Sequence, residues 1–406
     1  MKKSALVLLL LACLLLSGCS VFSREYVSIR DYVPTAQEPG AADGKITVRN
    51  FNALKQALLH MAYNGQTEGS IVFDAAYEGD TTEDMASACW SVRTQDALCA
   101  YCVENIAYEL NKIVTINEAG VHISYSDATE SPENIRHLAV SSEAENLILD
   151  ALDRGERKLA LLVGRSGFTA DDMAAQVLKA YRENPTVVPK EPTASVNIYS
   201  GTGAQRLYEI NIRYGLSQEE LENRLEELRA VRPFAEEETA VLSEPERALA
   251  ACRYLTEHCA VSEDPAANSA YSALVEGEAD SEGIAFAYVA LCRELGLDCR
   301  IVYGQHDWQE HCWNIVRLDG GYYHVDVTRC AEGEMASGFL ENDEGFWGLY
   351  RWDVSSYPKC QGELRYTDVM PEPVLTEKAP EEEHEPQENV EEPENYVGFT
   401  MMCDSK

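Results

Sequence analysis

The chain has 406 residues, a formal net charge of −36 at pH 7 and a hydrophobic content of 45%. A chain of this length has room for roughly two or three domains, each with its own core. The strong negative charge argues against nucleic acid and anionic lipid headgroups as partners, because both are also negatively charged. It favours a protein that stays soluble outside the cell.

The first residues predict the compartment. Two lysines precede an apolar stretch at residues 5–16, which is too short for a stable membrane-spanning helix. The tetrapeptide Leu-Ser-Gly-Cys that ends at Cys19 resembles the lipobox of bacterial lipoproteins, in which cleavage exposes the cysteine for lipidation. We therefore expect a signal peptide at residues 1–19 and a lipid anchor that holds the protein on the extracytoplasmic face of the cell membrane. The alternative is an ordinary secretory peptide with an incidental cysteine.

The number and spacing of the cysteines bear on disulfides and on metal binding. Of thirteen, Cys13 leaves with the signal peptide and Cys19 carries the lipid, so eleven remain and at least one is unpaired within the chain. Cys99 and Cys102 form the one CxxC motif, whereas zinc usually needs a second pair. In a strand, their odd separation would also send the two sulfurs to opposite faces. We expect no metal site and no cofactor.

Two repeated α/β units are predicted after a polar tether at residues 20–45. Units at 46–135 and 136–240 each show a helix, a strand, a second helix and a hairpin. The glycines around Thr202 lie between two strands, which favours a hairpin turn over a phosphate loop. No catalytic set occurs here, so the units are interpreted as scaffold or binding surface. The expected helices are 50–64, 82–92, 143–153 and 169–181; the expected strands are 70–77, 159–163, 194–199 and 207–214, with a hairpin around Asn117 ending at 121–125.

The remainder of the chain divides into a linking helix, a third domain and a tail. Ser217 followed by two glutamates predicts the start of a charged helix at 217–231. The third domain is expected at 241–370. Residues 371–406 are rich in Glu and Pro at first and contain few apolar residues, which predicts a disordered acidic tail.

Ser281 stands at the start of an apolar helix in this third domain. Apolar residues recur at helical spacing over residues 281–295, so one stripe of the helix should be buried. The free N–H groups and positive dipole at a helix N-terminus favour an anion and lower the pKa of a cysteine placed there. A serine in this position has a second use, since Ser and Asp are preferred N-cap residues.

His311 and Asp326 are predicted to lie on neighbouring strands. The Asp319-Gly320 pair indicates a two-residue hairpin turn, which sets Trp313 opposite Asp326. His311 then lies on the same face as Asp326, one diagonal step away, where a carboxylate can orient an imidazole. A three-residue turn would reverse this arrangement. The second strand is expected to run through residue 328.

These residues resemble the transglutaminase-like (papain-type) domain, including the form found in bacterial lipoproteins. The resemblance covers about residues 245–360 and implies an α+β fold, so we expect a papain-like C-terminal domain after two repeated α/β units. It implies that Ser281 occupies the position of the family's nucleophilic Cys, that His311 is the base and that Asp326 orients it. Further matches are residues 269–271, 274–277, 282–283, 296–297, 302–304, 346, 350–353 and 357–360.

Three departures from the family affect the expected activity: serine at 281, Ile284 in place of Tyr, and Cys312 in place of a small Ala. A serine hydroxyl is not ionised at neutral pH and needs a true general base. Cys312 should point to the other side of its strand, and Cys292 lies on the core-facing stripe, so neither is a good substitute nucleophile.

We therefore expect a non-catalytic transglutaminase-like domain that binds peptide or cell-wall material. Four tryptophans are expected to line its cleft or fill its core. One alternative is an active serine peptidase, amidase or acyl transferase that uses Ser281, His311 and Asp326. Another is an adaptor that works through the N-terminal units. The tryptophans are Trp308, Trp313, Trp347 and Trp352.

Overall fold

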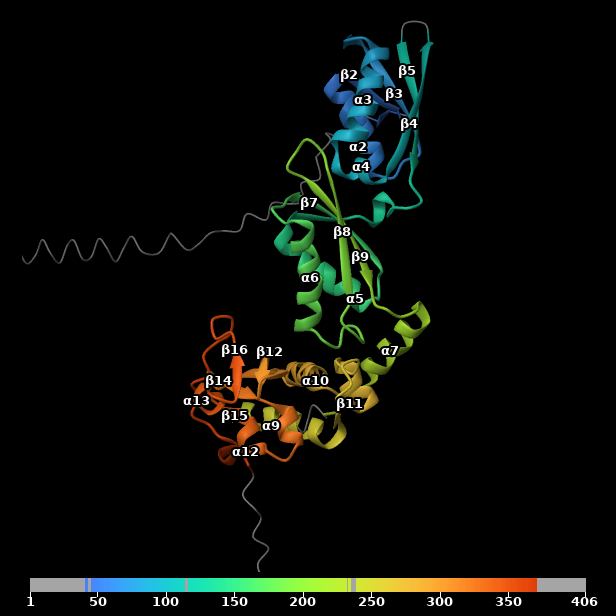
Figure 1. Cartoon of the computed structure of the whole chain (residues 1–406). Helices are drawn as coiled ribbons and strands as arrows, with labels where there is room; N and C mark the ends of the chain where they lie inside the picture. Colours follow the sequence, from blue (N-terminus) through green and yellow to red (C-terminus); the bar gives the residue numbers. More distant parts are fainter. Residues whose placement is uncertain (1–40, 43–44, 114–115, 232, 235–238, 371–406) are drawn as a thin grey trace, which may run out of the picture. The chain divides into compact units, whose positions relative to one another are not determined.

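The computed structural model describes residues 41–42, 45–113, 116–231, 233–234 and 239–370. It is an α+β structure with two mixed sheets in the N-terminal part and a five-stranded antiparallel sheet in the C-terminal part (Figure 1). Cys19 and the tail at 371–406 lie outside the described residues. Within the described residues, no helix combines the length and the apolar character needed to cross a bilayer. The tether was predicted too long, because β1 (Ala41–Ala42) and β2 (Lys45–Asn50) already form paired strands.

The first unit has one sheet with the order β1-β2-β3-β5-β4. β2 and β3 are parallel and joined by a helix, whereas β3, β5 and β4 are antiparallel neighbours. Apolar side chains of the first two helices and of β3 share one buried core. The elements after β2 are α2 (Phe51–Tyr63), β3 (Glu68–Glu78), α3 (Thr81–Gln95), α4 (Ala97–Cys102), β4 (Val103–Ile113) and β5 (Ile116–Tyr125).

The second unit repeats this arrangement in the order β6-β7-β9-β8. β6 and β7 are parallel, and β7, β9 and β8 are antiparallel neighbours. Helices α5 and α6 lie along the sheet (Figure 1) and share a core with alternate residues of β7. The elements are β6 (Arg136–Val140), α5 (Ala144–Asp153), β7 (Lys158–Arg165), α6 (Ala170–Glu183), β8 (Thr193–Ser200) and β9 (Arg206–Arg213).

The two sheets confirm the predicted repeat at the level of topology, since β2-β3-β5-β4 corresponds to β6-β7-β9-β8. The two units also share a glycine turn and a tyrosine hydrogen bond. The first helix of each unit is followed by a left-handed glycine, Gly65 (φ 64°) or Gly155 (φ 65°). The hydroxyl of Tyr125 or Tyr214 donates to the carbonyl of the residue after that glycine, at 3.0 and 2.8 Å. The sequence patterns missed the first strand of each unit, because β2 and β6 are short.

The CxxC motif lies in a helix, so the argument from a strand was wrong. Cys99 and Cys102 are in α4, where a separation of three places them on one side, and both are buried. Burial raises the pKa of the Cys102 thiol to about 12 and that of Cys99 well above its ordinary value. Both groups are therefore protonated thiols.

The C-terminal part follows the predicted linking helix α7 (Gln218–Ala230), which Ser217 caps. Its sheet has the order β15-β14-β13-β12-β16. The elements are α9 (Glu244–His258), β10 (Ala260–Val261), a π-helical turn (Ser272–Glu276), β11 (Glu278–Ala279), α10 (Ser281–Glu294), β12 (Asp298–His306), β13 (Gln309–Leu318), β14 (Gly321–Val325), α11 (Val327–Ala331), α12 (Met335–Gly338), β15 (Phe339–Glu341), α13 (Asp343–Phe346), β16 (Tyr350–Trp352) and α14 (Tyr366–Val369).

This sheet contributes to two hydrophobic cores. One contains the buried residues of α10, including Tyr288 and Cys292, together with Val316 and Leu318 of β13. The other contains Trp313 and residues of the segment 346–360. Alternate residues of β13 therefore face different cores, which fixes the register of the strand that carries His311.

Candidate functional site

Ser281 is the first residue of α10, but it is not the helix cap. The N-cap is Asp280, whose carboxylate accepts a hydrogen bond from the Gly283 N–H at 2.9 Å. The expectation that Ser281 could serve as the cap is therefore wrong. Gly283 has a packing role, since an added Cβ would lie 2.6 Å from the Ala267 carbonyl oxygen.

The Ser281 hydroxyl instead contacts the strand that carries His311. Its Oγ accepts a hydrogen bond from the Cys312 N–H at 3.3 Å. The pairing between β13 and β14 ends at Asn314 and Val325, so this contact lies just beyond the end of that ladder. Among the described residues it is the one hydrogen bond of the hydroxyl, and none joins it to His311.

The predicted two-residue turn is confirmed. Leu318 pairs with Gly321, and Asp319 (φ 49°) and Gly320 (φ 85°) form the turn between them. The second strand ends earlier than expected, at Val325. Asp326 leaves the strand and caps the short helix α11, because its Oδ1 accepts the Arg329 N–H at 3.2 Å.

The structure brings His311 and Asp326 together. His311 Nε2 lies 2.8 Å from Asp326 Oδ2, and the Tyr350 hydroxyl donates to the same oxygen at 2.7 Å. Asp326 is only 1% exposed. Its burial disfavours the charge, but the hydrogen bonds from His311, Tyr350 and the Arg329 N–H hold the pKa of this carboxyl below its usual value. Among the described residues, no hydrogen bond engages the second imidazole nitrogen, Nδ1.

Tyr350 is a site residue that the sequence reasoning missed. Tyr350 lies in residues 350–353, one of the stretches that resemble the family. Nothing in the sequence links it to Asp326, which lies 24 residues earlier. Its ring stacks on Phe346 at 3.8 Å and on His306 at 4.5 Å, so packing holds its hydroxyl in place.

Acidic residues flank Ser281 in the chain. Burial raises the pKa of both Asp280 and Glu282, the residues on either side of it. The Asn268 amide donates to Glu282 at 3.2 Å. Burial, followed by the nearby carboxylates, raises the pKa of the Cys312 thiol far above its ordinary value. The electrostatic environment therefore disfavours an anion at this position.

The tryptophans divide between core and surface. Trp313 is 1% exposed and belongs to the core, and Trp352 is partly buried against the same cluster. Trp308 and Trp347 are 75% and 76% exposed. Of the four tryptophans, Trp308 and Trp347 are therefore the two that are exposed enough to line a binding surface.

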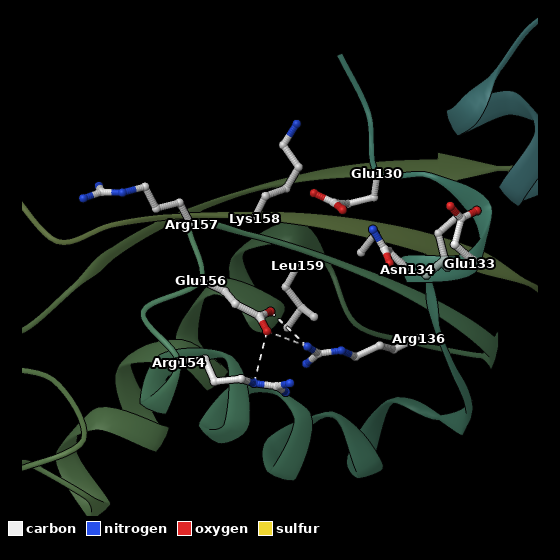
Figure 2. A pocket seen from close by; sticks show the side chains of 11 residues that line it. Glu130, Glu133, Asn134, Arg136, Arg154, Glu156, Arg157, Lys158 and Leu159 are labelled. Carbon is white, nitrogen blue, oxygen red and sulfur yellow. Dashed lines mark hydrogen bonds and ion pairs between the residues drawn. The ribbon is translucent and has the colours of Figure 1, made fainter. Parts of the chain in front are cut away.

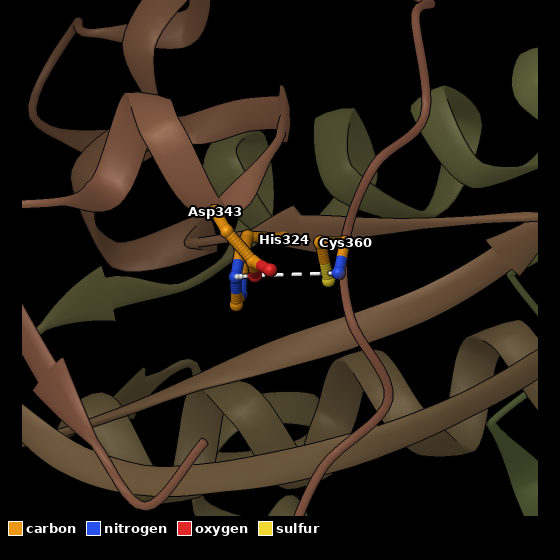
Figure 3. A group of neighbouring side chains, drawn as sticks. All are labelled: His324, Asp343 and Cys360. Atoms are coloured by element: carbon orange, nitrogen blue, oxygen red, sulfur yellow. Dashed lines mark hydrogen bonds and ion pairs between the residues drawn. The ribbon is translucent and has the colours of Figure 1, made fainter.

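A second histidine–aspartate pair lies on the neighbouring strand (Figure 3). His324 Nε2 is 3.0 Å from Asp343 Oδ1, and the Cys360 N–H donates to the same oxygen at 3.2 Å. One potential ligand atom from each of the three residues lies within 4.8 Å of the others, as in a metal site. However, the Trp313 indole N–H donates to His324 Nδ1 at 3.0 Å, so the proton of the neutral ring is on Nε2. That nitrogen has no lone pair for a metal, and the cluster is a satisfied hydrogen-bond network.

A cavity of about 580 Å³ lies beside the sheet of the second unit (Figure 2). Its basic side chains are already engaged. Glu156 binds Arg136 at 2.8 Å and Arg154 at 3.2 Å. Arg157 donates to the Leu216 carbonyl and Lys158 to the Ala128 carbonyl. These contacts engage hydrogen-bond donors of all four basic side chains within the unit.

Comparison with known proteins agrees with the site's location. Residues 230–327 match the family described as the Transglutaminase-like superfamily. The match places a transglutaminase-like domain at these residues, in the C-terminal half of the chain. The match includes Ser281, His311 and Asp326. A comparison with curated proteins gave no match.

Two of the solved structures that are similar to this chain are as follows. One is described as a TGase, with 12% identity, a TM-score of 0.21, and coverage of 51% of this chain and 61% of the other. The second is a proposed cysteine protease from Cytophaga hutchinsonii, with 12% identity, a TM-score of 0.21, and coverage of 41% and 69%. The chain thus spans less than two thirds of the first structure. At these identities and TM-scores neither structure assigns an activity to this chain.

Proposed function

We propose that this chain is a lipid-anchored, extracytoplasmic protein whose transglutaminase-like domain binds peptide or cell-wall peptide material without chemically changing it. The observation that carries the proposal is the state of the nucleophile position. The Ser281 hydroxyl bonds to the Cys312 N–H rather than to His311, and an acidic residue caps the helix beneath it.

The absence of a base contact disfavours serine catalysis. A serine becomes a nucleophile when a histidine nitrogen removes its proton, which requires a hydrogen bond between the two groups. Among the described residues, no such bond links Ser281 to His311. His311 is held by Asp326, and its free nitrogen can accept a proton from a bound ligand instead.

The acidic cap also disfavours acyl transfer. Acyl transfer builds negative charge on the substrate oxygen, and free N–H groups at a helix N-terminus can stabilise that charge. In α10 the Asp280 carboxylate accepts the Gly283 N–H at 2.9 Å, and its own charge opposes a second anion. The same carboxylates suit a ligand that carries positive charge.

A restored nucleophile tests the proposal. We expect the wild-type ectodomain to release no ammonia from glutamine peptides, to cleave no peptide and to incorporate no amine. Ser281→Cys should remain weakly reactive, because the thiol beside Asp280 resists ionisation. Ser281→Cys combined with Asp280→Asn should react faster with iodoacetamide at neutral pH, since asparagine keeps the cap but not the charge.

Matched variants complete this experiment. Adding His311→Ala to the double variant should remove any gained turnover while leaving the fold intact. Ser281→Ala serves as the control for the wild type. Wild-type turnover that Ser281→Ala abolishes would contradict the proposal.

The alternative is an active serine peptidase, amidase or acyl transferase, and the intact His311–Asp326–Tyr350 arrangement favours it. In that case a fluorophosphonate probe should label the native protein at Ser281. Labelling that disappears in both Ser281→Ala and His311→Ala would establish this alternative. No labelling of folded protein supports the non-catalytic function.

A further inference from the structure

Two hairpin turns at opposite ends of β13 have the same geometry but different sequences. His306 pairs with Gln309, so Asp307 and Trp308 form a two-residue turn with φ values of 48° and 69°. At the other end, Asp319 and Gly320 have φ values of 49° and 85°. Both are left-handed at both positions, as in the common two-residue hairpin turn.

The tryptophan is the unexpected member of this pair. Left-handed backbone is unfavourable for a side chain with a bulky Cβ substituent, which is why glycine is preferred at the second position. Trp308 is also 75% exposed, so burial gives little compensation. Strain of this kind persists most often at functional sites. The far turn shows what the same sheet uses when the turn has only a structural role.

A second exposed tryptophan lies in the adjacent segment. The Asp307 N–H donates to the Leu349 carbonyl at 3.1 Å, which joins the turn to the chain two residues after Trp347. Trp347 is 76% exposed and Leu349 is 44% exposed. The Arg351 guanidinium lies over the Trp308 ring, so one face of the indole is already in contact with a cation.

The segments that carry this surface also carry residues of the candidate site. Trp308 precedes His311 by three residues on the same hairpin. Tyr350, between Leu349 and Arg351, binds Asp326 through its hydroxyl. The two tryptophans are thus linked, through neighbouring residues of the chain, to the elements that carry the histidine–aspartate pair.

The charges around the surface favour a cationic ligand. Over residues 307–310 and 344–360, the exposed acidic residues are Asp307, Glu310, Glu344 and Asp353, and the exposed basic residues are Arg351 and Lys359. Tryptophan faces also attract ammonium and guanidinium groups. A neutral sugar would gain nothing from this charge.

The edge of the sheet favours a peptide over a sugar. β16 is the outer strand of its sheet. It follows Trp347 in the chain and pairs with β12, the strand that leads into the turn with Trp308. An extended peptide can pair its backbone with such an edge while its side chains reach neighbouring pockets. We propose that Trp308 and Trp347 form the docking surface for an extended cationic peptide with aromatic or aliphatic side chains. This inference rests on the proposed binding function and names its ligand class.

Fluorescence anisotropy of the whole ectodomain tests the surface. The probe is a fluorescein-labelled peptide of alternating lysine and phenylalanine, compared with the same peptide carrying glutamate in place of lysine. We expect the lysine peptide to bind, and its affinity to fall about tenfold or more in Trp308→Gly and in Trp347→Ala. Trp308→Gly should retain or raise the thermal midpoint, because it restores the preferred turn.

The far turn supplies the control. Gly320→Trp places the same residue pair at the other end of β13, where an added Cβ meets open space. It should lower the thermal midpoint without changing peptide affinity. Unchanged affinity in both tryptophan variants, or equal binding of the glutamate peptide, would overturn the inference. Binding of a chitin oligosaccharide in place of the lysine peptide would do the same.

The two proposals fail in distinguishable ways. Turnover of peptide by the wild type would overturn the non-catalytic function but leave the docking surface standing. Normal affinity in the tryptophan variants would remove the docking surface but not the account of Ser281.

Discussion

The histidines of two histidine–aspartate pairs lie on neighbouring strands of one sheet, and the two pairs differ in whether the second histidine nitrogen is bonded inside the protein. His311 and Asp326 are joined at 2.8 Å, and His324 and Asp343 at 3.0 Å. His324 is fully buried and its other nitrogen accepts the Trp313 indole N–H. His311 is partly exposed and keeps Nδ1 for another group. The same two residue types thus make a structural link in one place and a potential acid–base group in the other.

The difference teaches that the second partner decides the role of a histidine–carboxylate pair. A histidine whose two nitrogens are both bonded inside the protein has nothing to offer a ligand. A histidine held at one nitrogen and exposed at the other is oriented and available. The predictions below test this contrast, from the largest expected effect to the smallest.

Removing each histidine should separate the two pairs most clearly. His324→Ala leaves the Trp313 N–H and the Asp343 carboxylate without their partner inside the protein and should lower the free energy of unfolding by about 3 kcal/mol. His311→Ala should cost about 1 kcal/mol, because Asp326 keeps two other donors. Urea unfolding of both variants measures this. Equal losses of unfolding free energy in the two variants would show that the two pairs contribute equally to stability, contrary to this prediction.

Tyr350→Phe should have the next largest effect. It removes the hydroxyl that donates to Asp326 at 2.7 Å but keeps the ring stacked on Phe346. Hydrogen bonds to a charged acceptor are among the stronger ones, so we expect a loss of about 2 kcal/mol in unfolding free energy. A substitution at Trp313 would be a poor comparison for Tyr350→Phe, because Trp313 also fills the core. The control is Tyr322→Phe, a partly buried tyrosine whose hydroxyl has no hydrogen bond among the described residues. A loss below that of this control would contradict the role assigned to Tyr350.

The pH dependence of stability should differ between the pairs. Burial, which outweighs the Asp343 contact, lowers the pKa of His324 from 6.5. The unfolded chain therefore takes up this proton first, and the contribution of His324 is complete above about pH 6.5 and declines as the pH falls below it. The lowered pKa of Asp326 gives a contribution that is present above about pH 4 and declines only below that.

Urea unfolding at pH 7.5 and pH 5.5 measures the contribution of His324 to the pH dependence of stability. The wild type should lose about 1 kcal/mol more than His324→Gln between these two values. An identical loss in the two proteins would show that His324 does not carry this pH dependence.

The smallest effect is expected from zinc. The indole N–H of Trp313 fixes the proton of His324 on Nε2, so added Zn²⁺ should leave the thermal midpoint unchanged. Thermal unfolding with and without Zn²⁺, beside Cys360→Ala, measures this. A rise in the midpoint that Cys360→Ala removes would show that the cluster binds metal after all.

Much of the fold followed from local patterns. Periodicity and cap residues located the helices near Asn50, Thr169 and Ser217 to within a residue or two, because a cap side chain and an apolar stripe are local properties. The short strands β2 and β6 were missed, since a few residues carry too little periodicity. Strand geometry was the wrong basis for judging the CxxC motif, because the motif lies in the short helix α4, which has no long apolar repeat.

The site was predicted in part for the same reason. The Asp319-Gly320 turn correctly set the register that brings His311 to Asp326. The end of the strand at Val325 was not predicted, because Asp326 is drawn into capping α11. Tyr350 and the N-cap role of Asp280 depend on contacts or dihedral angles that no residue pattern states.

By itself, the sequence determined the repeated α/β units, the register of the His311 hairpin and the position of a serine at a helix start, because these depend on spacing along the chain. Only the tertiary structure decided which histidine is available and which is buried. It also decided that Asp280 rather than Ser281 caps α10, and that Trp308 and Trp347 are exposed. These properties arise from which groups meet across the fold, and the cost of leaving a buried polar group unpaired selects among them.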